Sequence, residues 1–346
     1  MLRAKPRQLS FYGNHIYDRV IPKDHFLKLL DKAVGFSFVN ELCRDAYTLD
    51  FGRPAYGPEM MFKILFLQFL YDVSDRRIEE EVNFNLVLKW FMGLAIDESP
   101  PDSSSLTRFR DRLGEERFAN IFNQIVEIAR EKGLVSDRLS IVDSTDVKAK
   151  VDTFKIKDDP DASPDKDARH GYKSEKKPFF GYKAHASMDS DSELITKLDT
   201  TPGNVNDGKE FPKVLDSQSR MATADKAYDS NKNRRLLKRK GTTSAIIIKK
   251  NRKNTRLRKH QTKPEIIAAQ RERPKIERKF AELKRFHGLK ESRYWGLAKT
   301  AIQFTMTAIA CNLKRIVKLL LHQGCLGISK PGSFHQGITV PISGQE

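Results

Sequence analysis

The stretch RLSIVDSTDVKA, residues 138–149, marks the point at which the pattern of the chain changes. It is short and rich in β-branched residues, as a buried strand would be. Residues 26–135, before it, have apolar positions at helical spacing, whereas the residues after it alternate short apolar runs with turns and helices. The sequence therefore predicts the α/β class, with an all-helical domain followed by a mixed-sheet domain.

The helical domain is predicted over residues 26–135, after a leader at 1–25 that has little periodicity. PEMMFKILFLQFLYDVS, residues 58–74, is apolar on most sides and predicts a buried helix. Further along, prolines and an Asp/Ser cluster precede SSLTRFRDRL, which is typical of a capped helix start. The arginines of that helix are candidates for DNA contacts, although a solvated helix face explains them equally well.

The mixed-sheet domain is predicted over residues 138–322, with a basic loop or insertion at about 250–270 and a mobile tail at 323–346. FFGYKAHASMDSDSELITKLDTTPG reads as strand, turn and strand, and MATADKAYDS reads as a strand running into a helix start. TTSAIIIKK predicts another strand, and helices are expected at 275–287 and near 296–321. The short first connections favour antiparallel hairpins, followed by parallel strands.

The net charge and its distribution along the chain indicate which kind of partner the protein binds. The formal net charge is +18 and the pI is about 9.7. Residues 232–299 hold 24 Lys or Arg against five Asp or Glu, so one region carries the basic excess. Such an excess favours a polyanionic partner, most simply nucleic acid, over a small-molecule substrate; a basic protein without such a partner is the plain alternative.

The remaining composition argues against other classes. Cys43, Cys311 and Cys325 form no CxxC pair, which argues against a disulfide framework or a zinc site and fits the reducing cytoplasm. The first residues lack the apolar core of a signal peptide, and the longest uncharged helical stretch is too short to span a bilayer. A cytoplasmic protein with no membrane role is therefore expected.

Three acidic residues stand out by their positions. Asp143 lies within the hydrophobic strand, where a charge costs several kcal/mol unless it is paired or bound to metal. Asp225 ends the MATAD strand, and strand ends are where α/β folds place ligand groups. Glu277 lies on the basic helix PKIERKFAELKRFHG, residues 274–288.

That basic helix contains a second glutamate, and helical geometry separates the two. At about 100° per residue, Glu277 lies roughly 90° from the apolar stripe and Glu282 roughly 130° from it. Glu277 is therefore expected at the border of the buried face and Glu282 further into solvent. A surface ion pair, worth about 0–1 kcal/mol, remains the plain alternative for either residue alone.

Three carboxylates in a basic α/β domain also suggest a chemistry. Mg²⁺ and Mn²⁺ prefer carboxylate oxygens. Two such ions about 4 Å apart activate an attacking oxygen and stabilise a leaving one in phosphodiester displacement. The sequence combines acidic ligands with cations that could bind phosphate, so this chemistry is one interpretation of Asp143, Asp225 and Glu277.

An ordered set of motifs then resembles a known family. IVDSTDVKA, FFGYKAH, TPGNVNDGKEFPKVL, ATADKAYDS, RPKIERKFAELKRFHG and NLKR, in that order, resemble the DDE transposases of bacterial insertion sequences over roughly residues 58–320. The resemblance implies an RNase H-like domain that binds two divalent ions through Asp143, Asp225 and Glu277. It also implies Arg273 and Lys284 as flanking cations, with hydrolysis at the element ends followed by strand transfer.

The same resemblance implies double-stranded DNA as the partner, through the element ends and the target, with a helical domain that helps to recognise the ends and at least a homodimer on DNA. One departure is Gln270, because this signature often has a tyrosine there. A nuclease without strand transfer and a non-catalytic DNA-binding protein are the alternatives.

Four further residues near these motifs are candidates. Lys183 and His185, in GYKAH, and Lys226, which follows Asp225, are predicted to contact DNA. A structural role for His185 is equally consistent with its position. Asp146 competes with Asp143 for the first metal position, and the motif match favours Asp143.

Overall fold

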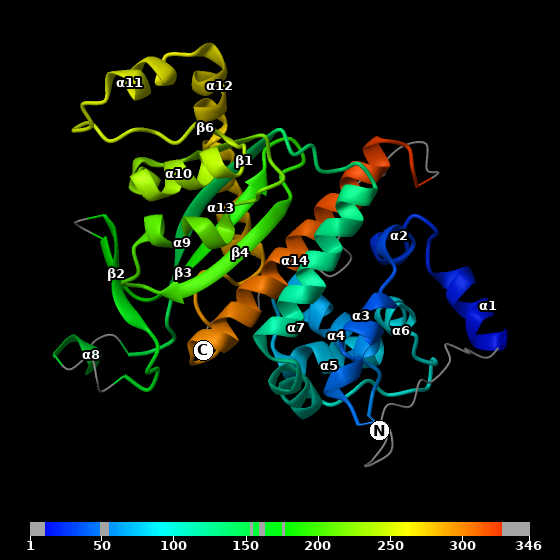
Figure 1. Ribbon diagram of the computed structural model, residues 1–346. Helices are drawn as coiled ribbons and strands as arrows, with labels where there is room; N and C mark the ends of the chain where they lie inside the picture. Colours follow the sequence, from blue (N-terminus) through cyan, green and yellow to red (C-terminus); the bar gives the residue numbers. More distant parts are fainter. Residues whose placement is uncertain (1–10, 49–54, 153–154, 159–162, 175–176, 327–346) are drawn as a thin grey trace. The chain divides into compact units, whose positions relative to one another are not determined.

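The computed structural model describes residues 11–48, 55–152, 155–158, 163–174 and 177–326 (Figure 1). The chain divides into two compact units, residues 1–112 with 316–346 and residues 113–315. Most of the predicted tail, and the first ten residues of the predicted leader, lie outside the described residues. The fold class is confirmed: a helical N-terminal region precedes a domain built on a mixed sheet.

The N-terminal unit is helical because its apolar residues recur at helical spacing. Ten of the fourteen residues of α4 are buried, as their apolar character predicts. Part of the expected leader also forms a helix, α1, because Tyr17 is buried and its hydroxyl donates to the Leu94 carbonyl over 3.0 Å. The helices of this region are α1 (Phe11–Val20), α2 (Phe26–Val34), α3 (Phe38–Leu42), the short η1 (Arg44–Ala46), α4 (Pro58–Tyr71), α5 (Asp75–Phe84), α6 (Leu86–Met92) and α7 (Ser103–Glu131), which is kinked at Gly114.

The second unit contains a six-stranded sheet with the order β2-β3-β1-β5-β6, and β4 also pairs with β3. The β1–β3 and β3–β4 pairs are antiparallel, whereas β1–β5 and β5–β6 are parallel, as predicted. Its strands are β1 (Leu139–Lys148), β2 (Arg169–Ser174), β3 (Lys177–Asp189), β4 (Ile195–Pro202), β5 (Met221–Ala224) and β6 (Thr243–Ser244). Its helices are α8 (Lys155–Asp158), α9 (Asp207–Val214), the short η3 (Lys226–Tyr228), α10 (Asn231–Arg239), α11 (Thr255–Gln261), α12 (Pro264–Glu272), α13 (Pro274–Phe286) and α14 (Leu297–His322).

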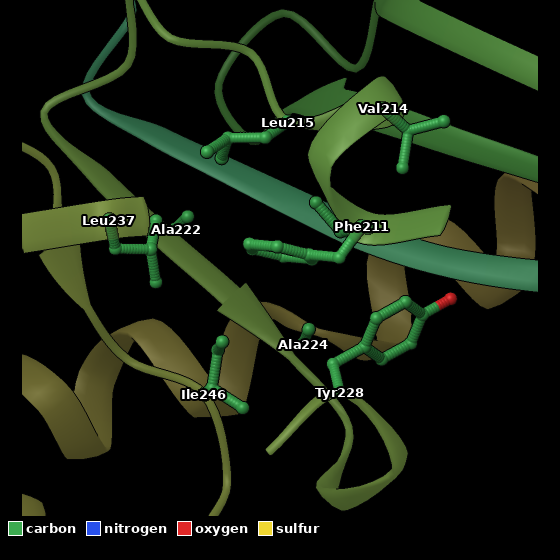
Figure 2. Packing of buried hydrophobic residues seen from close by; sticks show 9 residues of the cluster. Phe211, Val214, Leu215, Ala222, Ala224, Tyr228, Leu237 and Ile246 are labelled. Atoms are coloured by element: carbon green, nitrogen blue, oxygen red, sulfur yellow. The ribbon is translucent and has the colours of Figure 1, made fainter. Parts of the chain in front are cut away.

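Helices cover both faces of this sheet: α9 and α10 lie on one face and α13 lies behind the other (Figure 1). On the first face, Val142 of β1 packs with Phe211, Tyr228 and Leu237 from the α9–α10 side (Figure 2). Successive side chains of a strand point to opposite faces. Asp143, the residue after Val142, therefore points towards the face on which α13 lies.

The region after α10 is more helical than the sequence predicts. The strand predicted in TTSAIIIKK is assigned only at Thr243–Ser244, although the Ala245 and Ile247 amides still donate to the Ala222 and Ala224 carbonyls of β5. The predicted basic loop contains α11, which is capped by the Asn254 side chain. Isolated apolar runs do not specify how far a ladder continues, because that depends on the partner strand, and β5 is only four residues long.

Gly181 permits the close approach of β3 to the end of β1. Its φ is 152°, and an added Cβ atom would lie 2.2 Å from the Val147 carbonyl oxygen. We expect Gly181→Ala to lower the free energy of unfolding by about 2–3 kcal/mol, through backbone strain and overpacking. Gly241, at φ 72° with nothing within 4 Å of such a Cβ, is the matched control. Urea unfolding that gives the same loss for both alanine variants would contradict this account.

Two composition-based predictions can be compared with the described residues. Within them, no helix combines the length and apolar character needed to cross a membrane. The three cysteines are free thiols: Cys43 and Cys311 are buried and Cys325 is exposed.

Candidate functional site

Asp143 and Asp225 lie beside each other because their strands are parallel. The register pairs Val142 of β1 with Ala224 of β5, and each aspartate is the next residue. The Asp225 side chain accepts its neighbour's amide, Lys226 N–H, over 2.6 Å at the start of η3. The Asp143 Oδ1 atom accepts the Ser144 amide over 2.9 Å. Both carboxylates are thus oriented by the backbone that follows them.

Glu277 reaches the same site through an arginine. Arg273, at the junction of α12 and α13, donates from Nη1 to Asp143 Oδ2 over 2.9 Å and from Nη2 to Glu277 Oε1 over 2.6 Å. Glu277 lies one turn after Arg273, and Pro274 occupies the first helical position between them, where no amide donor is needed. One guanidinium therefore joins the carboxylate of β1 to that of α13.

Electrostatics at the site centre on Asp143. Its burial raises the pKa of the carboxyl to about 6, and the nearby carboxylates of Asp225 and Glu277 act in the same direction. The Ser144 amide and the Arg273 guanidinium oppose that rise. Crowded carboxylates of this kind favour a positive charge among them, a role that Arg273 fills here.

Two of the other predicted cations, Lys284 and Lys183, have partners within this unit. Lys284 donates to Asp146 Oδ1 over 2.9 Å, so both of these candidates take part in one ion pair. Lys183 donates to Asp207 Oδ1 and to the Val205 carbonyl, each over 2.9 Å.

His185 and Lys226 differ in exposure. His185 is fully buried with its Nε2 atom 2.9 Å from Thr201 Oγ1, and burial lowers its pKa to about 4. Lys226 is exposed. That Lys183, His185, Lys226 and Lys284 contact DNA stays a prediction.

The sequence did not predict a place near the carboxylates for two residues, Tyr228 and Asp207. Tyr228 is buried against Phe211, with ring centroids 5.8 Å apart, and it follows Asp225 by three residues (Figure 2). Its burial, reinforced by Asp143, Asp207 and Asp225, raises its pKa well above 10.0. The aromatic residue in ADKAYDS was the available signal, since it anchors the loop that begins at Asp225.

No three acidic, histidine or cysteine side chains among the described residues are grouped so that they could hold a metal ion. In this arrangement Arg273 donates to two of the three predicted ligands.

The chain was compared with known families and structures. The model of a family described as "Transposase DDE domain" matches residues 135–313, and one described as "Transposase domain (DUF772)" matches residues 15–112. A cryo-EM structure of a piggyBac transposase synaptic complex with hairpin DNA is similar at a TM-score of 0.42 and 12% identity, covering 87% of this chain and 75% of that one.

The match to the DDE domain extends over more than half of the 346 residues and includes β1, β5 and α13. The DUF772 match covers most of the helical region that precedes it. The chain therefore belongs to the transposases that carry a DDE domain, the family of insertion-sequence transposases that its ordered motifs predict.

Proposed function

We propose that this protein cuts the ends of a DNA element and joins the freed 3′ end to target DNA, with Asp143, Asp225 and Glu277 as the catalytic carboxylates. The observation that carries the proposal is the parallel register of β1 and β5, which sets Asp143 and Asp225 side by side. The bridge from Asp143 through Arg273 to Glu277 adds the third carboxylate. Membership of the DDE transposase family supports the same reaction class.

The donor atoms of the three carboxylates suit two divalent ions, once the Arg273 guanidinium no longer bridges Asp143 and Glu277. Mg²⁺ and Mn²⁺ favour hard oxygen ligands, and this site offers three carboxylates, one of which has a pKa raised by burial and by its neighbours. When bound, such ions would lower the pKa of an attacking hydroxyl and stabilise the leaving oxygen. Arg273 would then exchange its carboxylate partners for a DNA phosphate, a ligand that guanidinium binds in two-point fashion.

The reaction balances without any redox partner. In the first step a water oxygen bonds to phosphorus and gives up a proton, the bond from phosphorus to the 3′ oxygen breaks, and that oxygen takes up a proton and leaves as a hydroxyl. In the second step this 3′ hydroxyl oxygen bonds to a target phosphorus and gives up its proton, the bond from that phosphorus to the target 3′ oxygen breaks, and the target oxygen takes up a proton. The three carboxylates would hold the divalent ions at the reacting centre, and the nearby cations would bind the phosphates on either side.

The partners follow from this chemistry. Double-stranded DNA would serve as both element end and target, and bringing two ends together requires at least a homodimer. Residues 26–135 would contribute to recognising the ends. A cytoplasmic location, with the nucleoid when DNA is bound, stays a prediction from the free cysteines and the DNA partner.

The decisive experiment mixes the purified protein with linear DNA that carries the inverted repeats flanking its coding sequence, a target plasmid and Mg²⁺ or Mn²⁺. We expect end-cut fragments and joined products, and no products when the metal is chelated. End cutting without joined products would favour a nuclease, whereas binding without cutting would favour a non-catalytic DNA-binding protein. Activity that persists in excess chelator would contradict the metal site.

The basic excess makes a separate prediction about affinity. We expect the logarithm of the association constant for double-stranded DNA to fall linearly with the logarithm of salt concentration, with a slope of about −0.9 for each phosphate neutralised. Fluorescence anisotropy with a labelled duplex over a range of salt concentrations measures this slope, and sucrose at matched osmolality is the control. A slope near zero would argue against phosphate binding by residues 232–299.

A further inference from the structure

A continuous cationic segment lies between the second and third predicted carboxylates. Residues 231–263, here called the cationic segment, contain 14 Lys or Arg and no Asp or Glu. Twelve of these 14 side chains are exposed. The other two, Arg234 and Arg252, are partly buried, and both of them bind the same carboxylate, Asp229. Most of the positive charge of the segment is therefore exposed to solvent, and the remaining two cations bind the buried Asp229 carboxylate.

Asp229 is a buried anchor with three donors. Its side chain is 0% exposed. Its Oδ1 atom accepts Arg234 Nε–H over 2.7 Å, and its Oδ2 atom accepts Arg252 Nε–H and the Lys249 amide, each over 2.9 Å. Burial alone would raise the pKa of Asp229, but these three donors outweigh it and lower that pKa below its ordinary value. The carboxylate is therefore charged and fixed from three directions.

The donors come from separate parts of the cationic segment. Arg234 lies on α10, whereas Lys249 and Arg252 precede α11. Arg252 also donates from Nη1 to Asn231 Oδ1 over 2.8 Å, and its carbonyl accepts Arg258 Nε–H of α11 over 3.1 Å. Asp229 thus connects α10 to the segment that leads into α11.

The same anchor is connected to Asp225 by a short rigid turn. The Tyr228 amide donates to the Asp225 carbonyl over 3.0 Å, and the Asp229 amide donates to the Lys226 carbonyl over 3.1 Å. Asn233 Nδ2 donates to the Tyr228 carbonyl over 3.0 Å, and the Tyr228 ring is buried in the core. Only three residues lie between Asp225 and Asp229, and backbone hydrogen bonds and packing hold the turn that they form.

We propose that Asp229 is a positioning residue, which fixes the phosphodiester backbone of double-stranded DNA bound on the cationic segment relative to Asp225. This inference rests on the proposed function, because that proposal makes Asp225 a catalytic carboxylate. Twelve exposed cations without an acidic neighbour in the segment suit a polyanion, and B-form DNA offers one charge for about every 1.7 Å of its axis. Asp229 touches neither the DNA nor the reacting atoms and acts through Arg234, Arg252 and Lys249.

The first comparison uses Asp229→Asn and Asp216→Asn. The asparagine has one NH₂ group in place of a carboxylate oxygen, and an NH₂ group cannot accept a hydrogen bond. The variant therefore loses either the Arg234 bond or the bonds from Arg252 and the Lys249 amide. Asp216 is a buried carboxylate of the same unit, and it accepts Arg130 Nη2–H over 2.6 Å from α7 and not from the cationic segment. Both variants lose one buried charge, so their melting temperatures should fall by similar amounts, while only Asp229→Asn should alter DNA position.

Two experiments measure the position of the bound DNA relative to Asp225. For cutting, we expect Asp229→Asn to leave KM within about twofold and to lower kcat by about 10²-fold, with cuts spread over neighbouring nucleotides, as a misplacement of about 1 Å causes. Asp216→Asn should keep both the wild-type kcat and the wild-type cut site once both are corrected for the folded fraction. An equal loss of kcat in the two variants, or a rise in KM without a loss of kcat, would overturn the positioning role.

The second readout does not need activity. An iron chelate attached to the thiol of Lys226→Cys, in a background with Cys325→Ser to remove the exposed native thiol, cuts by hydroxyl radicals those nucleotides that lie near Asp225. We expect a narrow cluster of cuts that widens or shifts when Asp229→Asn is added. An unchanged cluster would overturn the inference, even in a protein that cuts DNA normally. A shifted cluster in a protein with no cutting activity would support it while contradicting the proposed function.

A second pair of variants keeps the test valid if Asp229→Asn does not fold. Arg252→Gln removes one cation and one of the three donors to Asp229, whereas Arg256→Gln removes one exposed cation of α11. Arg256→Gln should reduce the magnitude of the salt slope by about 0.9, because its exposed cation can meet a phosphate, whereas Arg252→Gln should change that slope little because Asp229 holds Arg252. Only Arg252→Gln should shift the hydroxyl-radical cluster; a shift of equal size in Arg256→Gln would overturn the role of Asp229.

Discussion

Asp225→Asn and Glu277→Gln are each expected to lower the rate of DNA-end cutting by about 10⁴-fold while the protein stays folded, as replacement of single catalytic groups does in other enzymes. Each substitution removes a negative charge without removing volume. The neutral amide still fills its place, but it binds a divalent cation weakly and cannot balance a second ion. Asp225 is partly exposed and the Glu277 side chain is 53% exposed, so the loss should fall on catalysis and not on stability.

Glu282→Gln is the matched control on the same helix, because it makes the same chemical change five residues further on. Cutting is measured on end-labelled DNA at a temperature at which circular dichroism shows all variants folded. We expect the Glu282→Gln variant to cut within about threefold of wild type once the rate is corrected for the folded fraction, because Glu282 pairs with Lys279 and Lys314 and not with the predicted catalytic residues. Wild-type rates in Asp225→Asn or Glu277→Gln would refute the carboxylate assignment.

Lys279→Ala is expected to lower the free energy of unfolding by about 3 kcal/mol, within the range for breaking a buried ion pair. The Lys279 side chain is only 5% exposed, and its Nζ atom lies 2.8 Å from Glu282 Oε2 and 3.5 Å from Cys311 Sγ. Burial alone would lower the pKa of Lys279, but Cys311 and Glu282 keep that pKa raised. Removing the ammonium leaves Glu282 partly buried with Lys314, 3.7 Å away, as its remaining cation.

Urea unfolding of the full chain measures this loss, with Arg278→Ala as the control. Arg278 is an exposed neighbour on α13, and its removal should change the free energy of unfolding by less than about 0.5 kcal/mol. Lys279→Met should recover part of the loss, because it restores the buried methylenes without the charge. If Lys279→Ala and Arg278→Ala destabilise the protein equally, the pair contributes nothing beyond a surface contact.

Glu282 also marks where the sequence prediction was wrong. One helix wheel places Glu282 further from the apolar stripe than Glu277, yet its side chain is 32% exposed and that of Glu277 is 53% exposed. The wheel describes one helix by itself. Cys311 and Lys314 of α14 lie against the Lys279–Glu282 side of α13, and no periodicity within α13 could predict that cover.

Much of the α/β domain was predictable because its signals are local. The β-branched run at 138–149 and the turn DSDS predict β1 and the β3–β4 hairpin, and short connections predict the change from antiparallel to parallel pairing. Asp143 within one strand and Asp225 at the end of another are visible as charges in apolar runs. The extent of β6 was not predictable, because it depends on how many residues of β5 remain to pair.

The sequence by itself determined the order of helices and strands, the region of basic charge and the three carboxylates that the family motifs contain, because each is written in spacing, composition or residue identity. The tertiary structure decided which charges meet. It joined Asp143 to Glu277 through Arg273, paired Lys284 with Asp146 and buried Asp229 under Arg234 and Arg252. These pairs span up to 138 residues of sequence, and only the packing of helices against the sheet brings such distant charges within hydrogen-bond distance.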